Sequence, residues 1–103
     1  MTDRISLLTE ILSQSPDDAF ARYGLALEYA NSGQIEAAIR EFKTILDKNS
    51  EYVPAYQMWA QTLITAGRRD EAQELLHKGI AAAQRTRNQH ALSEMEGMLM
   101  ELG

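Results

Sequence analysis

The sequence predicts an all-α fold built from stacked helical hairpins. Only two prolines and six glycines interrupt its 103 residues, and no segment alternates apolar and polar residues as a half-buried strand would. Two stretches 34 residues apart, 23–42 and 57–76, carry small residues at the same positions. The matched residues are Ala26 with Ala60, Gly33 with Gly67, and Ala38 with Ala72. A helical unit that repeats at this interval is typical of an α-solenoid.

A proline separates the first two expected helices. The first begins after Thr2 and Asp3, and its apolar face is formed by residues at helical spacing: Ile5, Leu8, Ile11 and Leu12. Pro16 ends this helix, because a residue that precedes proline is disfavoured in the helical region. Asp17 and Asp18 then favour a helix start, where negative charge meets the positive end of the helix dipole.

Glycines and polar residues mark the later boundaries. Gly33 and Gly67 can adopt the left-handed conformation that closes a helix. Asn49 or Ser50 is a candidate break and cap before the fourth helix, and Asn88 is a candidate cap before the sixth. The expected second to sixth helices are 18–32, 35–48, 52–66, 69–86 and 89–102.

The repeated pattern resembles the tetratricopeptide repeat (TPR) family, whose unit reads W-x2-L-G-x2-Y, then A-x3-F, then P. One copy reads Arg22-x2-Leu25-Ala26-x2-Tyr29, Ala38-x3-Phe42, Ser50, and the next reads Tyr56-x2-Trp59-Ala60-x2-Leu63, Ala72-x3-Leu76, Gln84. The resemblance implies a TPR-like α-solenoid of six antiparallel helices, similar to small stand-alone bacterial TPR proteins. Its parts would be a half-repeat at 1–16, repeats at 19–52 and 53–86, and a capping helix at 87–103.

The departures from the family pattern carry expectations of their own. Arg22 stands where the family has an aromatic residue, so its stem should cover apolar surface while its head reaches water, or that edge is loosely packed. Ser50 and Gln84 replace the proline between repeats, so those junctions rely on a Ser50 cap or on a helix that runs past its usual end. Continuing the 34-residue interval places polar residues at core positions in the last helix. We therefore expect that helix to be rotated out of the repeat register.

The composition and motifs of the sequence disfavour several classes of function. The formal net charge is −5 and no basic stripe is present, which disfavours nucleic-acid binding. Cysteine is absent, His77 and His90 lack the spacing of a metal site, and no phosphate-binding glycine loop is found. No apolar run is long enough to span a membrane, and the N-terminus does not read as a signal peptide. We expect a cytoplasmic protein with no catalytic residues, cofactor or metal.

The resemblance implies binding of a protein or peptide in a concave groove lined by the first helix of each repeat. The implied groove residues are Phe20, Tyr23, Leu27, Ala30, Asn31, Gln57, Met58, Gln61, Ile64 and Thr65. A clamp for a C-terminal carboxylate is disfavoured, because Asn31 is the single residue of that kind. Tyr23 and Leu27 add apolar surface beyond what the repeat needs, so the groove is either open or covered by a terminal helix. A second hypothesis is weak homodimerisation through a methionine-rich last helix that carries Met95, Met98 and Met100.

Overall fold

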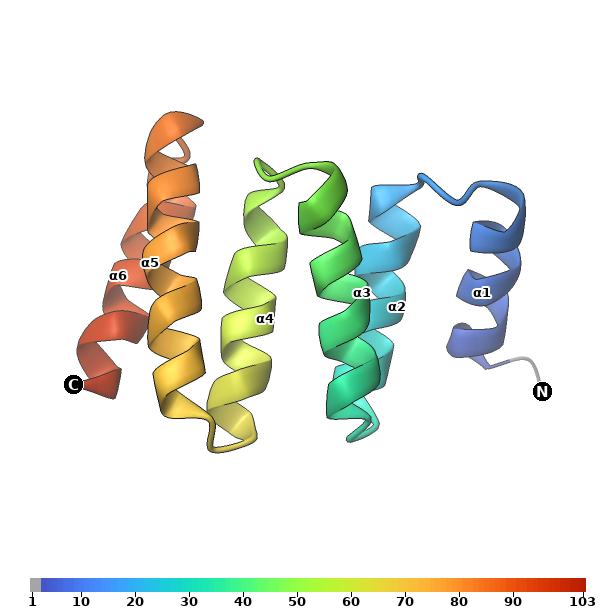
Figure 1. The fold of residues 1–103 in the computed structure, drawn as a ribbon, viewed down its shortest axis with the longest axis horizontal. Coiled ribbons are helices and arrows are strands. Elements are labelled where there is room, and N and C mark those ends of the chain that lie inside the picture. The colour runs from blue at the N-terminus through green and yellow to red at the C-terminus, as the bar shows by residue number, and fades with distance from the viewer. Residues whose placement is uncertain (1–2) are drawn as a thin grey trace.

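The computed structural model describes residues 3–103, which form six α-helices joined by short turns (Figure 1). Their bounds are α1 Arg4–Gln14, α2 Ala19–Asn31, α3 Ile35–Lys48, α4 Val53–Thr65, α5 Arg69–Arg85 and α6 Gln89–Leu102. These bounds match the expected helices to within two residues, and the described residues contain no strand. The all-α prediction is therefore confirmed.

The helices form two layers in an elongated molecule of 41 × 28 × 19 Å. Each helix packs against its chain neighbours, and α4 also contacts both α2 and α6. Within residues 3–103, α1, α3 and α5 do not contact one another. The layer of α2, α4 and α6 is therefore the closer-packed one, which makes it the inner layer of the curved stack.

Side-chain caps begin three of the helices. The carboxylates of Asp3 and Asp18 accept hydrogen bonds from the backbone N–H groups three residues on, at 2.7 and 3.0 Å, and the Asn88 amide oxygen does the same at 3.1 Å. The expected cap at Asn49 or Ser50 was wrong, because Tyr52 precedes α4 and makes no side-chain cap. The Ser50 carbonyl instead accepts a hydrogen bond from the Tyr56 hydroxyl at 2.8 Å.

Left-handed residues close three helices. Gly33 and Gly67 have φ of 80° and 77° and end α2 and α4 as expected. Arg87 takes the same conformation after α5, with φ of 58°. In all three turns the left-handed residue and the one after it donate backbone hydrogen bonds to the last turn of the helix. The chain thus uses an arginine where the two earlier turns use glycine.

The small residues of the repeat lie where helices cross. Ala26, Ala38, Ala60 and Ala72 are all fully buried, because a larger side chain at these positions would hold the crossing helices apart. Phe42 and Leu76, the large residues of the pattern on α3 and α5, are also fully buried. The steric assignment of the repeat pattern is confirmed.

Three hydrophobic clusters follow one another along the stack. Leu12, Ala21 and Leu25 centre the first, between α1 and α2. Phe42 and Ile45 lie in the second, which joins α2, α3 and α4. The third is the largest and joins α4, α5 and α6. Three half-buried residues each contact two clusters: Tyr29, Leu46 and Trp59.

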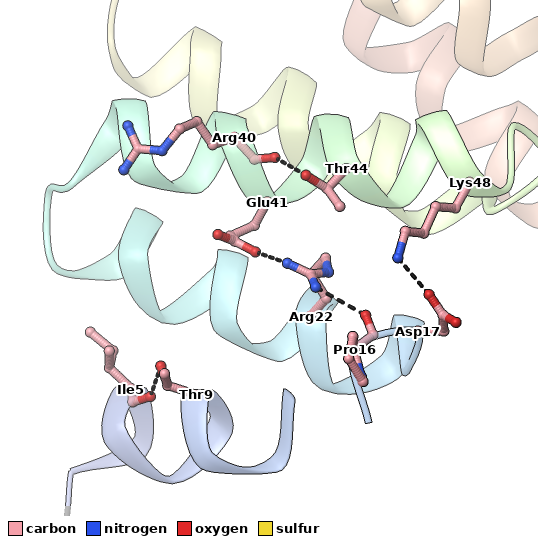
Figure 2. Close-up of polar contacts among 9 residues, drawn as sticks. All are labelled: Ile5, Thr9, Pro16, Asp17, Arg22, Arg40, Glu41, Thr44 and Lys48. Atoms are coloured by element: carbon pink, nitrogen blue, oxygen red, sulfur yellow. Dashed lines mark hydrogen bonds and ion pairs between the residues drawn. The ribbon is translucent and has the colours of Figure 1, made fainter. Parts of the chain in front are cut away.

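The head of Arg22 is less exposed to water than the sequence suggested. Its guanidinium donates to the Glu41 carboxylate at 2.6 Å and to the Pro16 carbonyl at 3.0 Å (Figure 2). Only 18% of each side chain of the Arg22–Glu41 pair is exposed. The charged pair therefore holds α2, α3 and the preceding turn together where the family uses an aromatic residue.

The last helix is out of the 34-residue register, as the sequence predicted. Helix α4 begins 34 residues after α2, but α6 begins 36 residues after α4. The shift of two residues puts Ala91, Met95 and Leu99 where α4 has Ala55, Trp59 and Leu63. The longer α5 accounts for the shift, since it has 17 residues where α3 has 14 and the turn after it is one residue shorter than the turn after α3. This helix runs past Gln84, which is one of the two junction arrangements expected from the sequence.

Candidate functional site

An aromatic cluster fixes the positions of α2, α3 and α4. The ring of Tyr23 lies 6.4 Å from that of Phe42 and 5.8 Å from that of Tyr52, centroid to centroid. Phe42 in turn stacks on Trp59 at 6.4 Å, with only 9° between the ring planes. Burial raises the pKa of the Tyr23 and Tyr52 hydroxyls above the ordinary value of 10.0. Tyr23 is therefore half-buried against α3 and the residue that precedes α4.

A small hollow of about 120 Å³ lies between α2 and α4, next to the start of α3. We call it the α2–α4 hollow. Six of the ten residues expected in the groove line it, together with Ile35 and Thr62. The six are Leu27, Ala30, Asn31, Met58, Gln61 and Thr65. The repeat pattern thus brings together residues that are about 30 apart in sequence.

The other expected groove residues lie outside the hollow. Phe20 is 80% exposed at the start of α2, and Tyr23 belongs to the aromatic cluster. Gln57 donates from its amide to the Glu94 carboxylate of α6 at 3.0 Å. Ile64 is half-buried against the third hydrophobic cluster. Gln57 therefore contacts the capping helix, and Ile64 packs against the third cluster rather than lining the hollow.

Glu94 lies beside the expected groove residues of α4, and the sequence interpretation missed it. It lies beside α4 through its hydrogen bond with Gln57, and its carboxylate is 3.3 Å from the imidazole Nε2 of His90. A 34-residue interval places Glu94 at a core position of the last helix, where a carboxylate is unsuitable. The 36-residue interval instead places Glu94 beside α4, so α6 contributes a carboxylate to the inner layer.

The charges around the α2–α4 hollow do not suit an anionic ligand. No lysine or arginine lines it, and its polar groups are the amides of Asn31 and Gln61 and the hydroxyls of Thr62 and Thr65. The Thr62 hydroxyl is already committed, since it donates to the Met58 carbonyl at 2.7 Å. The hollow can therefore accept an apolar side chain and hydrogen-bond a neutral backbone.

A larger cavity of about 540 Å³ opens at the junction of the α1–α2 turn with the end of α3. Its two cations are both paired: Arg22 with Glu41, and Lys48 with Asp17 (Figure 2). Its apolar lining comes from Pro16, Ala19 and Ile45. The paired cations leave this cavity with no unbalanced positive charge.

The methionines of α6 do not form one surface. Met100 is 82% exposed, but Met95 is fully buried against Gly79 and Tyr56. The expected adaptable surface therefore lacks its first member. Among residues 3–103, no group of three or more metal-ligating side chains comes together, and no helix is long and apolar enough to cross a bilayer.

The family of the chain follows from this repeat geometry together with a family model. The tetratricopeptide repeat model matches residues 5–58 and 29–95, which together span most of the chain. The chain belongs to the tetratricopeptide repeat family. A TPR fold is that of a protein–protein interaction module, which stacks repeats to present an extended concave surface.

Solved structures show how this TPR chain compares with others. A protein from Bordetella parapertussis is 29% identical, covers 99% of this chain and 89% of its own, and has a TM-score of 0.86. A TPR domain protein from Salinibacter ruber is 26% identical over 84% of this chain and 88% of its own, with a TM-score of 0.79. The TPR2B domain of yeast Sti1, solved as a complex with pHsp70, is 20% identical over 95% of this chain and 78% of its own. Its TM-score of 0.87 shows a likeness of fold. A search among curated proteins found no significant match.

Proposed function

We propose that this TPR chain is a non-catalytic adaptor that binds an extended peptide or a helix of a partner protein along its inner layer. The observation that carries the proposal is the α2–α4 hollow, where Leu27 and Met58 offer apolar contact beside the exposed residues Asn31 and Gln61. That chemistry suits an apolar side chain on a peptide whose backbone bonds to the amides. Within this proposal, 19–52 and 53–86 are the two repeats that form the site.

Two features support a neutral or basic ligand over an acidic one. The hollow carries no cation, and Glu94 adds negative charge at the C-terminal end of the inner layer. The Sti1 domain is described as a complex with pHsp70. We take from that neighbour only that this fold can hold a peptide. For this chain we propose a neutral or basic ligand.

The test is a peptide selection followed by mapping of the bound site. A displayed library of random peptides is selected against the whole chain, and the best binder is titrated into labelled protein by NMR. We expect the amide signals of Leu27, Asn31, Gln61 and Thr65 to shift. Gln61→Lys should weaken binding at least tenfold, because it places a charged side chain over the hollow. Shifts confined to the outer layer, α3 and α5, would overturn the proposal.

The matched control is Lys43→Gln on α3. Lys43 and Gln61 are both exposed helix residues, so neither change should unfold the protein. Tyr23 is a poor choice for such a test, since its ring packs on Phe42 and Tyr52. Losing that packing would reduce stability and binding together.

A further inference from the structure

Three large apolar side chains are exposed together at the α1 end of the molecule. Leu7 and Ile11 of α1 are 51% and 39% exposed, and Phe20 of α2 is 80% exposed. Scattered exposed apolar residues need no explanation. These three do, because they lie on neighbouring helices and are three of the four large apolar residues exposed in residues 3–103.

The same positions are covered in the other two outer-layer helices. The residue 34 positions after Ile11 is Ile45, which is 2% exposed, and the residue 34 positions after Leu7 is the half-buried Glu41. A further 34 positions on, Leu75 is 7% exposed. Helices α2 and α4 cover those sites on α3 and α5. Within residues 3–103, no helix takes the corresponding place beside α1, which packs against α2 alone (Figure 1).

The register of α1 against α2 can be read from two contacts. Arg4 donates to the Glu28 carboxylate at 2.6 Å, and a Cβ on Gly24 would lie 3.5 Å from the Leu8 side chain. The two helices run antiparallel, so each step along α1 is matched by a step back along α2. This register sets Ile11 and Phe20 at nearly the same height.

Helical periodicity then places the three side chains on one side of the α1–α2 pair. Leu7 and Ile11 are one turn apart on α1, and Phe20 and Leu27 are two turns apart on α2. Leu27 faces the α2–α4 hollow. The three exposed residues therefore form a strip that extends from that hollow across the α1 end of the inner layer. We call Leu7, Ile11 and Phe20 the N-terminal strip.

Carboxylates border the strip. Asp3 and Glu10 stand four residues before and three residues after Leu7, which makes them its neighbours on the helix surface. The cation beside Leu7, Arg4, is already paired with Glu28. A ligand helix with lysine or arginine flanking its apolar face would complement this border. A second copy of this chain, with its net charge of −5, would meet like charge.

Size also favours a single helix over a second copy. The exposed parts of the three side chains present roughly 300 Å², the size of a small functional patch, and a standard stable dimer needs about 800 Å² from each partner. Arg4 stands 34 residues before the crossing residue Ala38. Because arginine is much larger than alanine, a bound helix cannot approach α1 at Arg4 as closely as α2 approaches α3 at Ala38. The bound helix would therefore lie nearer Ile11 and Phe20.

We propose that the N-terminal strip binds a basic amphipathic helix of a partner protein, in the place beside α1 that α2 and α4 occupy beside α3 and α5. The proposal rests on the adaptor function for the nature of the ligand, but it uses residues outside the α2–α4 hollow. The bound helix would bury Leu7, Ile11 and Phe20 and set its cations against Asp3 and Glu10.

The probe is a synthetic amphipathic helix of leucine and lysine about 18 residues long, enough for a stable helix. Its comparison peptides are a leucine and glutamate version and a scrambled leucine and lysine version. Each is titrated into the labelled full chain by NMR and by calorimetry. We expect the leucine and lysine helix to shift the amides of Leu7, Ile11 and Phe20. The glutamate and scrambled peptides should bind at least tenfold more weakly.

The variants are the double change Leu7→Ser with Phe20→Ser, and the control Met100→Ser. All three side chains are exposed, so the fold should survive. The double change should raise the dissociation constant at least tenfold, and the control should leave it unchanged. Equal binding of the scrambled or glutamate peptide, an unaffected double variant, or dimers of the free chain that this variant abolishes would each overturn the proposal.

The two proposals fail in different ways. If the leucine and lysine helix shifts only Leu27, Asn31 and Gln61, the strip proposal is wrong and the adaptor proposal stands. If it shifts only the strip, the strip proposal is supported whatever the random-peptide selection shows. If the mapped shifts fall on the outer layer in both experiments, both proposals are wrong.

Discussion

Replacing Gly79 with alanine should destabilise this protein, although alanine is the better helix former. Gly79 lies inside α5 where α4, α5 and α6 meet. A Cβ built there would be 2.6 Å from the Met95 sulfur and 2.7 Å from the Tyr56 Cβ. Both distances are shorter than Cβ atoms tolerate, so at least one neighbour has to move. The Met95 side chain can rotate away, but the Tyr56 Cβ moves only with the backbone of α4.

Two opposing terms set the size of the effect. Alanine gains about 1 kcal/mol over glycine in a helix interior. Overpacking a closed core costs about 1–3 kcal/mol, and the high end applies here because a helix backbone has to shift. We therefore expect Gly79→Ala to lower the free energy of unfolding by about 1–2 kcal/mol.

The matched control is Gly97→Ala in α6, where a Cβ would meet nothing within 4 Å. This variant should gain about 0.5–1 kcal/mol from the helix preference alone. Urea unfolding followed by far-ultraviolet circular dichroism measures both variants. In a domain of this size, 1 kcal/mol corresponds to a change in Tm of about 4–8 °C. If Gly79→Ala were as stable as Gly97→Ala, the close packing of α4, α5 and α6 at Gly79 would be disproved.

Three further predictions concern conformation and ionisation. Arg87→Gly should raise the free energy of unfolding by about 0.5–1 kcal/mol, because glycine adopts the left-handed conformation without strain. Gly33→Ala should lower the free energy of unfolding by about 1 kcal/mol for the converse reason. Thermal unfolding of both variants checks the pair, and the opposite order of stabilities would contradict the left-handed conformation of these two residues. Arg68 holds the pKa of Glu71 below the ordinary 4.5, so the stabilisation by this pair is present above pH 4.5 and is lost as the pH falls through the lowered pKa. Glu71→Gln should flatten that part of the acid-unfolding curve. An unchanged curve would refute a stabilising role for the pair. Burial raises the pKa of Tyr23 above 10.0, so its contribution to stability is complete below pH 10 and is lost as the pH rises through the raised value. An ultraviolet absorbance titration should therefore lose a late-ionising group in Tyr23→Phe, and identical titrations would contradict the burial.

The sequence predicted the parts of this fold that repeat. Glycines at 33 and 67 marked two turns, and the alanines at the crossings identified the inner and outer faces of the hairpins. What it could not predict came from partners far apart or from unmarked turns. Arg22 pairs with Glu41 on the next helix, and nothing local to Arg22 points to that carboxylate. The turn after α5 uses Arg87 rather than glycine, so no residue type marked its left-handed position as glycine marked the two earlier ones.

The sequence predicted only part of the candidate groove, because the last helix follows a different interval from the two repeats. Residues on α2 and α4 follow one interval, so Leu27, Asn31 and Gln61 meet at the hollow as the family pattern implies. Gln57 instead bonds to Glu94, because α6 packs beside α4 with a different interval. The sequence predicted which faces point inward but not which of those residues the last helix covers.

The division of the core into three clusters has a consequence for how the molecule opens. Among residues 3–103, only Tyr29, Leu46 and Trp59 pack against two clusters, so loss of one cluster need not destroy the next. In the part of the chain that the structure describes, the first cluster is the smallest and α1 contacts no helix but α2. Amide hydrogens of α1 should therefore exchange with solvent fastest among the helices, through fraying that leaves α4 to α6 closed. A ligand bound to α1 would slow that exchange, so α1 would unfold together with the rest of the chain rather than before it.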